Sequence, residues 1–105
     1  MKKFKTFREL HLELLKDPED AKMYLEIALE EYEKDQDKEA FLQAIRDVAE
    51  VRGGLAKLAK RIHLTRQNLQ KVLFSKKVPK LETIGIILHG LGFRLSVEFL
   101  SKKAA

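Results

Sequence analysis

The sequence predicts an all-α domain of five helices that ends in a short β-strand. Three observations predict this fold class. Apolar residues recur at helical spacing through most of the chain, helix-start signals precede these stripes, and strict apolar–polar alternation is confined to 93–99. A chain of 105 residues, 45% of them hydrophobic, supports one modest core. We therefore expect a single domain over 1–105, made of acidic N-terminal helices (1–37), a helical core (38–92), a strand (93–100) and a tail (101–105).

The first 37 residues carry two helix-start signals. Thr6 and Glu9 have the spacing of a capping box, which predicts a short helix to about Lys16. Asp17 followed by Pro18 places an N-cap acid before a proline at the first helical position, which predicts a second helix to about residue 32. Three apolar positions of the first helix share one face, namely Phe7, Leu10 and Leu14.

The segment 53–74 is predicted to form two short helices joined by a tight turn, after a helix from about 38 to 52 that Gly53-Gly54 ends. His63 lies where a left-handed backbone is expected, and Thr65 is a plausible N-cap for the second helix. This arrangement is typical of a helix-turn-helix, so we place that motif in the 38–92 core. The inward positions of its first helix are Leu55, Leu58, Ala59 and Ile62.

A last helix is expected over about 81–91, ended by Gly92. The alternating residues 93–99 then predict a strand. Because a lone strand leaves its backbone unpaired, it must pair with the Lys2–Phe7 segment, with a second copy of itself, or with another protein's sheet edge. The alternative is a short extended tail that lies on the helices.

The charge is divided between the two halves of the chain. Residues 1–50 hold 9 Lys or Arg and 14 Asp or Glu, a net charge of 9 − 14 = −5. Residues 51–105 hold 12 and 2, a net charge of 12 − 2 = +10, and the sum is the +5 of the whole chain. A basic half of this kind predicts a phosphate-bearing partner, while the acidic half must serve another purpose.

Enzymatic function is disfavoured. The chain has no cysteine, its three histidines fall in different predicted elements, and no nucleophile has a base beside it. We therefore expect no catalytic residues, no metal and no cofactor. The longest apolar run is too short to span a membrane and no signal peptide is visible, so a cytoplasmic protein is expected.

The outward face of the predicted second helix of the motif carries side chains suited to major-groove recognition of double-stranded DNA. The bland alternative is a helical hairpin with a solvated basic face. The candidate base-reading residues are Arg66, Gln67, Asn68, Gln70 and Lys71, and Gln67 and Lys71 should point furthest outward. The candidate phosphate contacts are Gly54, Leu55, Lys57, Lys60, Thr65, Lys76 and Lys77.

Two further pairs of residues are candidates for a partner or dimer surface. Tyr24 and Ile27 widen the apolar stripe of the second helix beyond what one small core needs. Leu95 and Val97 belong to the predicted strand. A homodimer would match a pseudo-palindromic operator with recognition helices about 34 Å apart.

From about Leu10 to Phe99 the order and spacing of short fragments resemble a known family. The fragments are Leu15-Lys16-Asp17-Pro18-Glu19-Asp20-Ala21, Tyr24-Leu25, Ala28-Leu29-Glu30-Glu31, Arg46-Asp47-Val48-Ala49, Arg52-Gly53-Gly54, Leu58-Ala59, Leu64-Thr65-Arg66, Leu69, Pro79-Lys80-Leu81, Thr83 and Leu91-Gly92-Phe93-Arg94-Leu95. The resemblance is to the probable addiction-module antidote family, the HigA-like antitoxins with an Xre/Cro-type helix-turn-helix. Three positions depart from the family pattern: Gln70 stands where Tyr is usual, Lys77-Val78 where Gly-Asn is usual, and His63 where Gly is usual.

The resemblance implies a lambda-repressor-like fold and a DNA-binding antitoxin of a type II toxin-antitoxin module. Such a protein neutralises a RelE-like toxin and represses its own promoter. Two alternatives stay open: a stand-alone prophage-type transcriptional repressor without a toxin partner, and an interaction module whose helix-turn-helix no longer binds DNA. The operator sequence and the identity of the toxin also stay open at this point.

Overall fold

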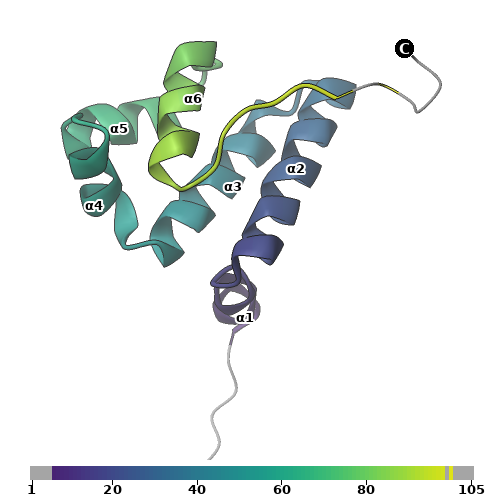
Figure 1. Cartoon of the computed structure of the whole chain (residues 1–105), viewed down its shortest axis with the longest axis horizontal. Helices are drawn as coiled ribbons and strands as arrows, with labels where there is room; N and C mark the ends of the chain where they lie inside the picture. The colour runs from purple at the N-terminus through teal and green to yellow at the C-terminus, as the bar shows by residue number, and fades with distance from the viewer. Residues whose placement is uncertain (1–5, 99, 101–105) are drawn as a thin grey trace, which may run out of the picture.

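The computed structural model describes residues 6–98 and 100, and these residues form six helices and no strand (Figure 1). The helices are α1 (Phe7–Leu14), α2 (Pro18–Asp35), α3 (Lys38–Val51), α4 (Gly54–Arg61), α5 (Arg66–Leu73) and α6 (Leu81–Gly90). The all-α class is confirmed, and each segment predicted to be helical is helical. The count of five was one too low, although the segments predicted one by one along the chain, including two helices before residue 37, correspond to the six helices observed.

The predicted helix starts are confirmed by their hydrogen bonds. Thr6 and Glu9 form a reciprocal capping box: the Thr6 hydroxyl accepts from the Glu9 N–H at 3.1 Å, and the Glu9 carboxylate accepts from the Thr6 N–H at 2.7 Å. The Asp17 carboxylate caps α2 by accepting from the Glu19 N–H at 2.9 Å. The end of α2 was placed a few residues too early. It runs on to Asp35, where Gln36 takes up a left-handed conformation with φ of 61°.

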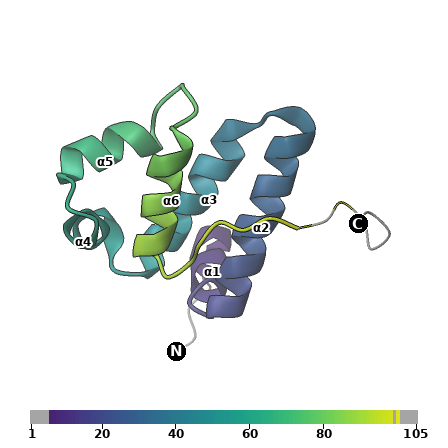
Figure 2. The ribbon, with the colours of Figure 1, turned by 45° about the horizontal axis from the view of Figure 1, so that its top comes forward.

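The central helix is α3, which contacts α1 and α2 on one side and α4 and α5 on the other. In both ribbon views α3 lies between the pair α1–α2 and the group α4–α6 (Figure 2). Because α3 buries apolar side chains on nearly all sides, this short chain has one continuous core. That core is the main source of its stability. The α3 side chains in that core are Phe41, Leu42, Ala44, Ile45, Val48 and Ala49.

The predicted strand over 93–100 is not present in the described residues. Residues 93–98 are extended but pair with no other segment, and Phe99 lies outside the described residues. Residues 2–5 of the proposed pairing segment also lie outside them, and Phe7 begins α1. After α6 the chain passes across α3 towards α2 (Figures 1 and 2), so it follows the alternative of an extended tail on the helices. The physical reason is that no neighbouring strand offers it a ladder.

Close packing places α6 against α4. A Cβ atom added at Gly90 would lie 2.6 Å from Ile62 Cγ2 and 2.8 Å from Leu58 Cδ1, so only glycine allows this approach. The Arg61 guanidinium donates to the Gly90 carbonyl at 3.2 Å across the same contact. Across the described ranges, no helix combines the length and the hydropathy that a bilayer crossing needs.

Candidate nucleic-acid interface

The turn between α4 and α5 has the geometry that the sequence predicts. His63 adopts a φ of 61°, and the Leu64 N–H donates to the Ala59 carbonyl at 3.0 Å, which closes the C-terminal end of α4. Thr65 then caps α5 by accepting from the Asn68 N–H at 3.0 Å. Both predictions for the turn are thereby confirmed. The short connection holds α4 and α5 in direct contact.

One face of α5 is buried and the opposite face is free. Leu69 and Leu73 are fully enclosed in the core, with an exposed fraction of 0%. All five candidate base-reading residues are exposed. Gln67 and Lys71 are four residues apart on the side opposite the buried leucines, because three- and four-residue spacings share a helix face. The helix therefore presents a continuous row of donors and acceptors to solvent.

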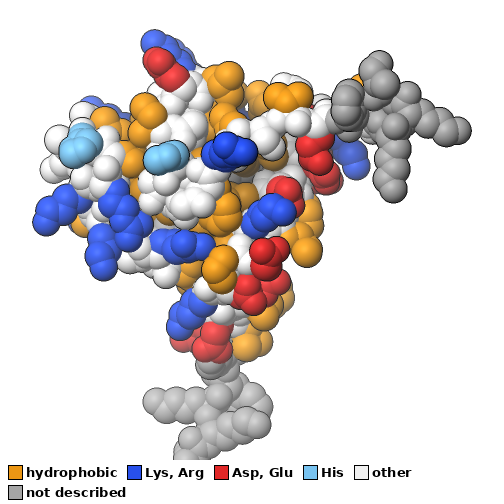
Figure 3. Space-filling view, in the orientation of Figure 1, with side chains coloured by type: hydrophobic (Ala, Val, Ile, Leu, Met, Phe, Trp, Pro, Cys, Tyr) orange, Lys and Arg blue, Asp and Glu red, His pale blue; other side chains and the backbone are white. Residues whose placement is uncertain are grey.

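The candidate phosphate contacts lie at the rim of this exposed face. Lys57 and Lys60 are exposed on α4, and Lys76 and Lys77 are exposed in the segment after α5. Lys and Arg side chains gather over α4 and its surroundings, whereas most Asp and Glu side chains in this view lie over α1 and α2 (Figure 3). Between Glu50 and Glu82 the chain has no acid at all. That segment itself therefore adds no negative charge, and Glu50 is the acid that lines the cleft beside Gly54 and Leu55.

The N-terminus of α4 has free hydrogen-bonding capacity. Gly53 occupies the N-cap position with φ of 110° and supplies no side-chain cap. The half-buried Gly54 and Leu55 follow it, and together with Arg66 they line one open cleft of about 360 Å³. The structure thus brings together three candidate residues from two helices, at the positive end of the α4 dipole.

Arg46 holds the C-terminal end of α5 through its side chain. The sequence analysis did not identify it as a structural residue. Its guanidinium donates to the Leu73 carbonyl at the end of α5 and to the Gln43 side chain at 2.6 Å, and it pairs with Glu39 at 2.9 Å. It also stacks over the Phe74 ring at 4.3 Å from the ring centre. The sequence signal that could have identified Arg46 is a positively charged residue between the buried positions of α3. Arg46 fixes how far α5 projects from the core.

Asp47 is the other residue that the sequence analysis missed. It is 2% exposed, and its carboxylate accepts from the Tyr24 hydroxyl at 2.8 Å, the Gln43 amide at 2.8 Å and the Arg8 guanidinium at 3.1 Å. Burial, together with the hydrogen bond to Asp47, raises the pKa of Tyr24 to about 12. The hydrogen bond to Asp47 likewise raises the pKa of Arg8. This network ties α1 and α2 to α3.

The candidate partner residues fall in different places. Tyr24 is half-buried and its hydroxyl is held by Asp47, whereas Ile27 is 52% exposed on the outside of α2. Leu95 is at the border of exposure and Val97 is fully exposed. The structure therefore does not bring the four together on one surface.

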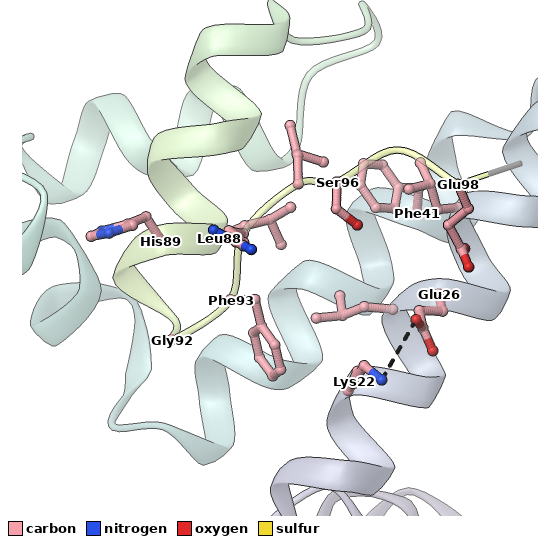
Figure 4. Close-up of a pocket in the computed structure, with 13 residues that line it drawn as sticks. Lys22, Glu26, Phe41, Leu88, His89, Gly92, Phe93, Ser96 and Glu98 are labelled. Atoms are coloured by element: carbon pink, nitrogen blue, oxygen red, sulfur yellow. Dashed lines mark ion pairs between the residues drawn. The ribbon is translucent and has the colours of Figure 1, made fainter.

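A shallow groove runs beside the C-terminal segment, between it and the helices α2, α3 and α6. The groove has a volume of about 800 Å³ and is lined by Phe41, Leu88 and Phe93 at its apolar floor, with the Lys22–Glu26 ion pair at 3.9 Å on its rim (Figure 4). Leu95 lines this groove and Val97 does not. Within the described ranges, no three His, Cys, Asp or Glu side chains are grouped so as to hold a metal ion.

The sequence of the chain is similar to that of a known protein family. The model of a family described as "probable addiction module antidote protein" matches residues 4–99 of the chain. No curated protein and no solved structure matches the chain.

Proposed function

This chain belongs to the probable addiction module antidote family, and from that premise we propose that it is the DNA-binding antitoxin of a type II toxin-antitoxin module. It neutralises a RelE-like toxin and represses its own promoter, with α4 and α5 acting as a lambda-repressor-like helix-turn-helix. An antidote acts by binding its toxin, so the chain is not an enzyme. We propose that it acts in the cytoplasm, where both DNA and the toxin are present.

The observation that carries the DNA-binding half is the division of α5 into a buried apolar face and an exposed polar face. Leu69 and Leu73 hold the helix in the core, and Arg66, Gln67 and Lys71 remain exposed. In a major groove these side chains meet base edges, where Arg pairs with guanine and Gln or Asn with adenine. No acid lies between Glu50 and Glu82 in the sequence, so this segment itself adds no negative charge that would repel phosphates.

The phosphate contacts set the register of α5. The N–H groups of Gly54 and Leu55 at the open N-terminus of α4 suit one phosphate oxygen, and Lys57 stands one turn further on. Thr65 keeps its hydroxyl proton free for donation, because the oxygen is already an acceptor for the Asn68 N–H. The remaining contacts are Lys60, Lys76 and Lys77, all exposed.

A homodimer is part of the proposal. One recognition helix of 8 residues covers only a half-site, so two-fold symmetry and half-sites about 34 Å apart are expected. Leu95 and the exposed Val97 are the candidate dimer positions on the C-terminal segment, whose backbone forms no ladder with the other described residues.

The first test measures DNA binding by fluorescence anisotropy, with a labelled duplex taken from directly upstream of the gene and a scrambled duplex. We expect tight binding to the first and an affinity that falls steeply with salt. Gln67→Ala should weaken binding to the upstream duplex by about 1–3 kcal/mol and leave binding to the scrambled duplex unchanged. Lys76→Ala should weaken both duplexes alike and reduce the salt slope by about one. Lys34→Ala, an exposed lysine on α2, is the control and should change neither. Equal affinity for both duplexes would contradict operator recognition.

The second test concerns the toxin. We would co-express the chain with the product of the adjacent small open reading frame, and measure co-purification and rescue of growth. A stable complex that relieves toxicity supports the antitoxin. If the neighbour neither binds nor poisons, the chain is a stand-alone repressor and the toxin half of the proposal is wrong.

A further inference from the structure

The N-terminal helix α1 exposes its apolar stripe. None of its residues is buried, and Phe7, Leu10 and Leu14 are 87%, 50% and 62% exposed. The helix is attached through its other face, where Arg8 bonds to Asp47 and Glu50 and the His11 ring meets the Tyr24 ring at 4.7 Å. A row of three large apolar side chains on one helix is therefore left largely exposed by the residues that the structure describes.

The outer side of α2 also exposes apolar side chains. Met23 and Ile27 are 56% and 52% exposed. Ile27 follows Tyr24 by three residues and Leu14 follows His11 by three, so both side chains border the seam that the two rings form. Leu14 and Ile27, exposed apolar side chains from two helices, thus lie within one helical turn of the ring contact between α1 and α2. Single exposed apolar residues are ordinary on protein surfaces, but a contiguous group marks an interaction site.

The charge around this surface indicates which kind of partner binds there. Residues 6–35 hold 4 Lys or Arg and 10 Asp or Glu, a net charge of 4 − 10 = −6. Asp20 and Glu31 are exposed on the Ile27 side of α2. Asp20 lies about one helical turn before Tyr24, and Glu31 lies about two turns after it. A second copy would bring one acidic surface against another, because a two-fold interface places the same patch on both sides. A basic protein meets no such repulsion.

We propose that the apolar rows of α1 and α2 form the docking surface for a basic partner protein, and that this partner is the toxin. The inference rests on the toxin half of the proposed function. Because the Asp47 network holds α1 on α3, the surface is formed before the partner arrives, which lowers the entropic cost of binding. In the ribbon, α1 and α2 lie across α3 from α4 and α5 (Figure 1), although Arg8 of α1 lines the same cleft as Gly54 and Arg66.

The experiment measures the affinity of the purified full-length chain for the product of the adjacent small open reading frame, by surface plasmon resonance. The test variants are Phe7→Ser and the double variant Leu14→Ser with Ile27→Ser. Ile86→Ser on α6 is the matched control, since Ile86 is 51% exposed on the opposite half. Circular dichroism and upstream-duplex binding verify that each variant is folded, and the exposure of the substituted side chains makes folding the expected result.

We expect the double variant to bind the neighbour's product at least about thirtyfold more weakly, as loss of a hot spot of about 2 kcal/mol would produce. Ile86→Ser should bind as the unaltered chain does. Glu31→Lys should slow association, most at low salt, because it removes electrostatic attraction.

The other outcomes overturn the inference in distinguishable ways. If the unaltered chain binds the product and the double variant binds it equally well, this surface is not the docking site, while the proposed function stands. If the variants bind the product normally but no longer self-associate in light scattering, the occupant is a second copy. If the unaltered chain does not bind the product at all, the toxin half of the proposed function fails and the inference fails with it.

Discussion

The helices on the two sides of α3 use their faces in opposite ways. In α5 the apolar residues Leu69 and Leu73 face the core and the polar residues face solvent. In α1 the polar residues Arg8 and His11 face the buried Asp47 and Leu12 packs against the core, whereas the stripe of Phe7, Leu10 and Leu14 faces solvent. Amphipathic spacing predicts the buried face of α5, but it does not predict that α1 turns three of its large apolar side chains outwards. Where a buried carboxylate offers strong hydrogen bonds, a face that carries polar side chains can be turned inwards.

The strongest test of this comparison removes the buried acceptor. We expect Asp47→Ala to lower the free energy of unfolding by about 3 kcal/mol, because Tyr24 and Gln43 lose their acceptor in a poorly hydrated place. Urea unfolding followed by circular dichroism measures the loss. Glu50→Ala is the control: Glu50 binds the same arginine at 2.9 Å but is exposed, so its cost should stay below about 1 kcal/mol. Equal losses would show that burial of Asp47 contributes nothing.

The corresponding test on the other side of α3 removes the fastening of α5. Arg46→Ala should lower the free energy of unfolding by about 2 kcal/mol, because the guanidinium bonds the end of α5 and stacks on Phe74. It should also weaken upstream-duplex binding without touching a base. Arg66→Ala should do the reverse, with stability within about 0.5 kcal/mol of the unaltered chain and weaker DNA binding. Stability changes of the same size in both variants would refute the distinction.

A smaller effect separates close packing from helix propensity within α6. Gly90→Ala should destabilise the protein by about 1–2 kcal/mol, because its Cβ would overlap Ile62 and Leu58. Gly85→Ala should stabilise it by about 0.5–1 kcal/mol, since its Cβ would meet only Leu95 Cδ1, at 3.8 Å, and alanine favours a helix. Thermal unfolding of the two variants compares them directly. A gain in both would mean that the α4–α6 contact can open at no cost.

The smallest effect is a pH dependence confined to the α1–α2 side. The pKa of Tyr24 is raised from 10.0 to about 12, so the folded state holds the phenol proton more tightly than the unfolded state does. This contribution to stability is complete below pH 10 and is lost as the pH rises towards about 12. Urea midpoints measured over that range should fall less steeply in Tyr24→Phe than in Tyr32→Phe, which serves as the control. Identical slopes would show that the Asp47–Tyr24 contact does not influence ionisation.

Much of the local structure was predictable from the sequence. The capping box at Thr6, the left-handed turn at His63 and the N-cap at Thr65 were predicted, and all three are confirmed. Each depends on hydrogen bonds between groups at most five residues apart, so the order of side chains along the chain is sufficient. The inward positions of α5 were predictable for a related reason, since that helix has only one face apolar enough to bury.

Tertiary structure decided the features that depend on distant residues. Asp47 is acceptable in the core only because Arg8 and Tyr24, from two other helices, reach its carboxylate. Arg46 becomes a fastening for α5 only because the Leu73 carbonyl, 27 positions along the chain, ends beside it. Residues 93–98 alternate like a strand, but the described part of the chain offers no strand for them to pair with, and they lie extended on the helices. The sequence by itself determined where each helix begins and turns, through contacts within a few residues. Which face α1 buries was settled only when side chains from separate helices met, because a buried polar group is stable only with partners that local spacing does not specify.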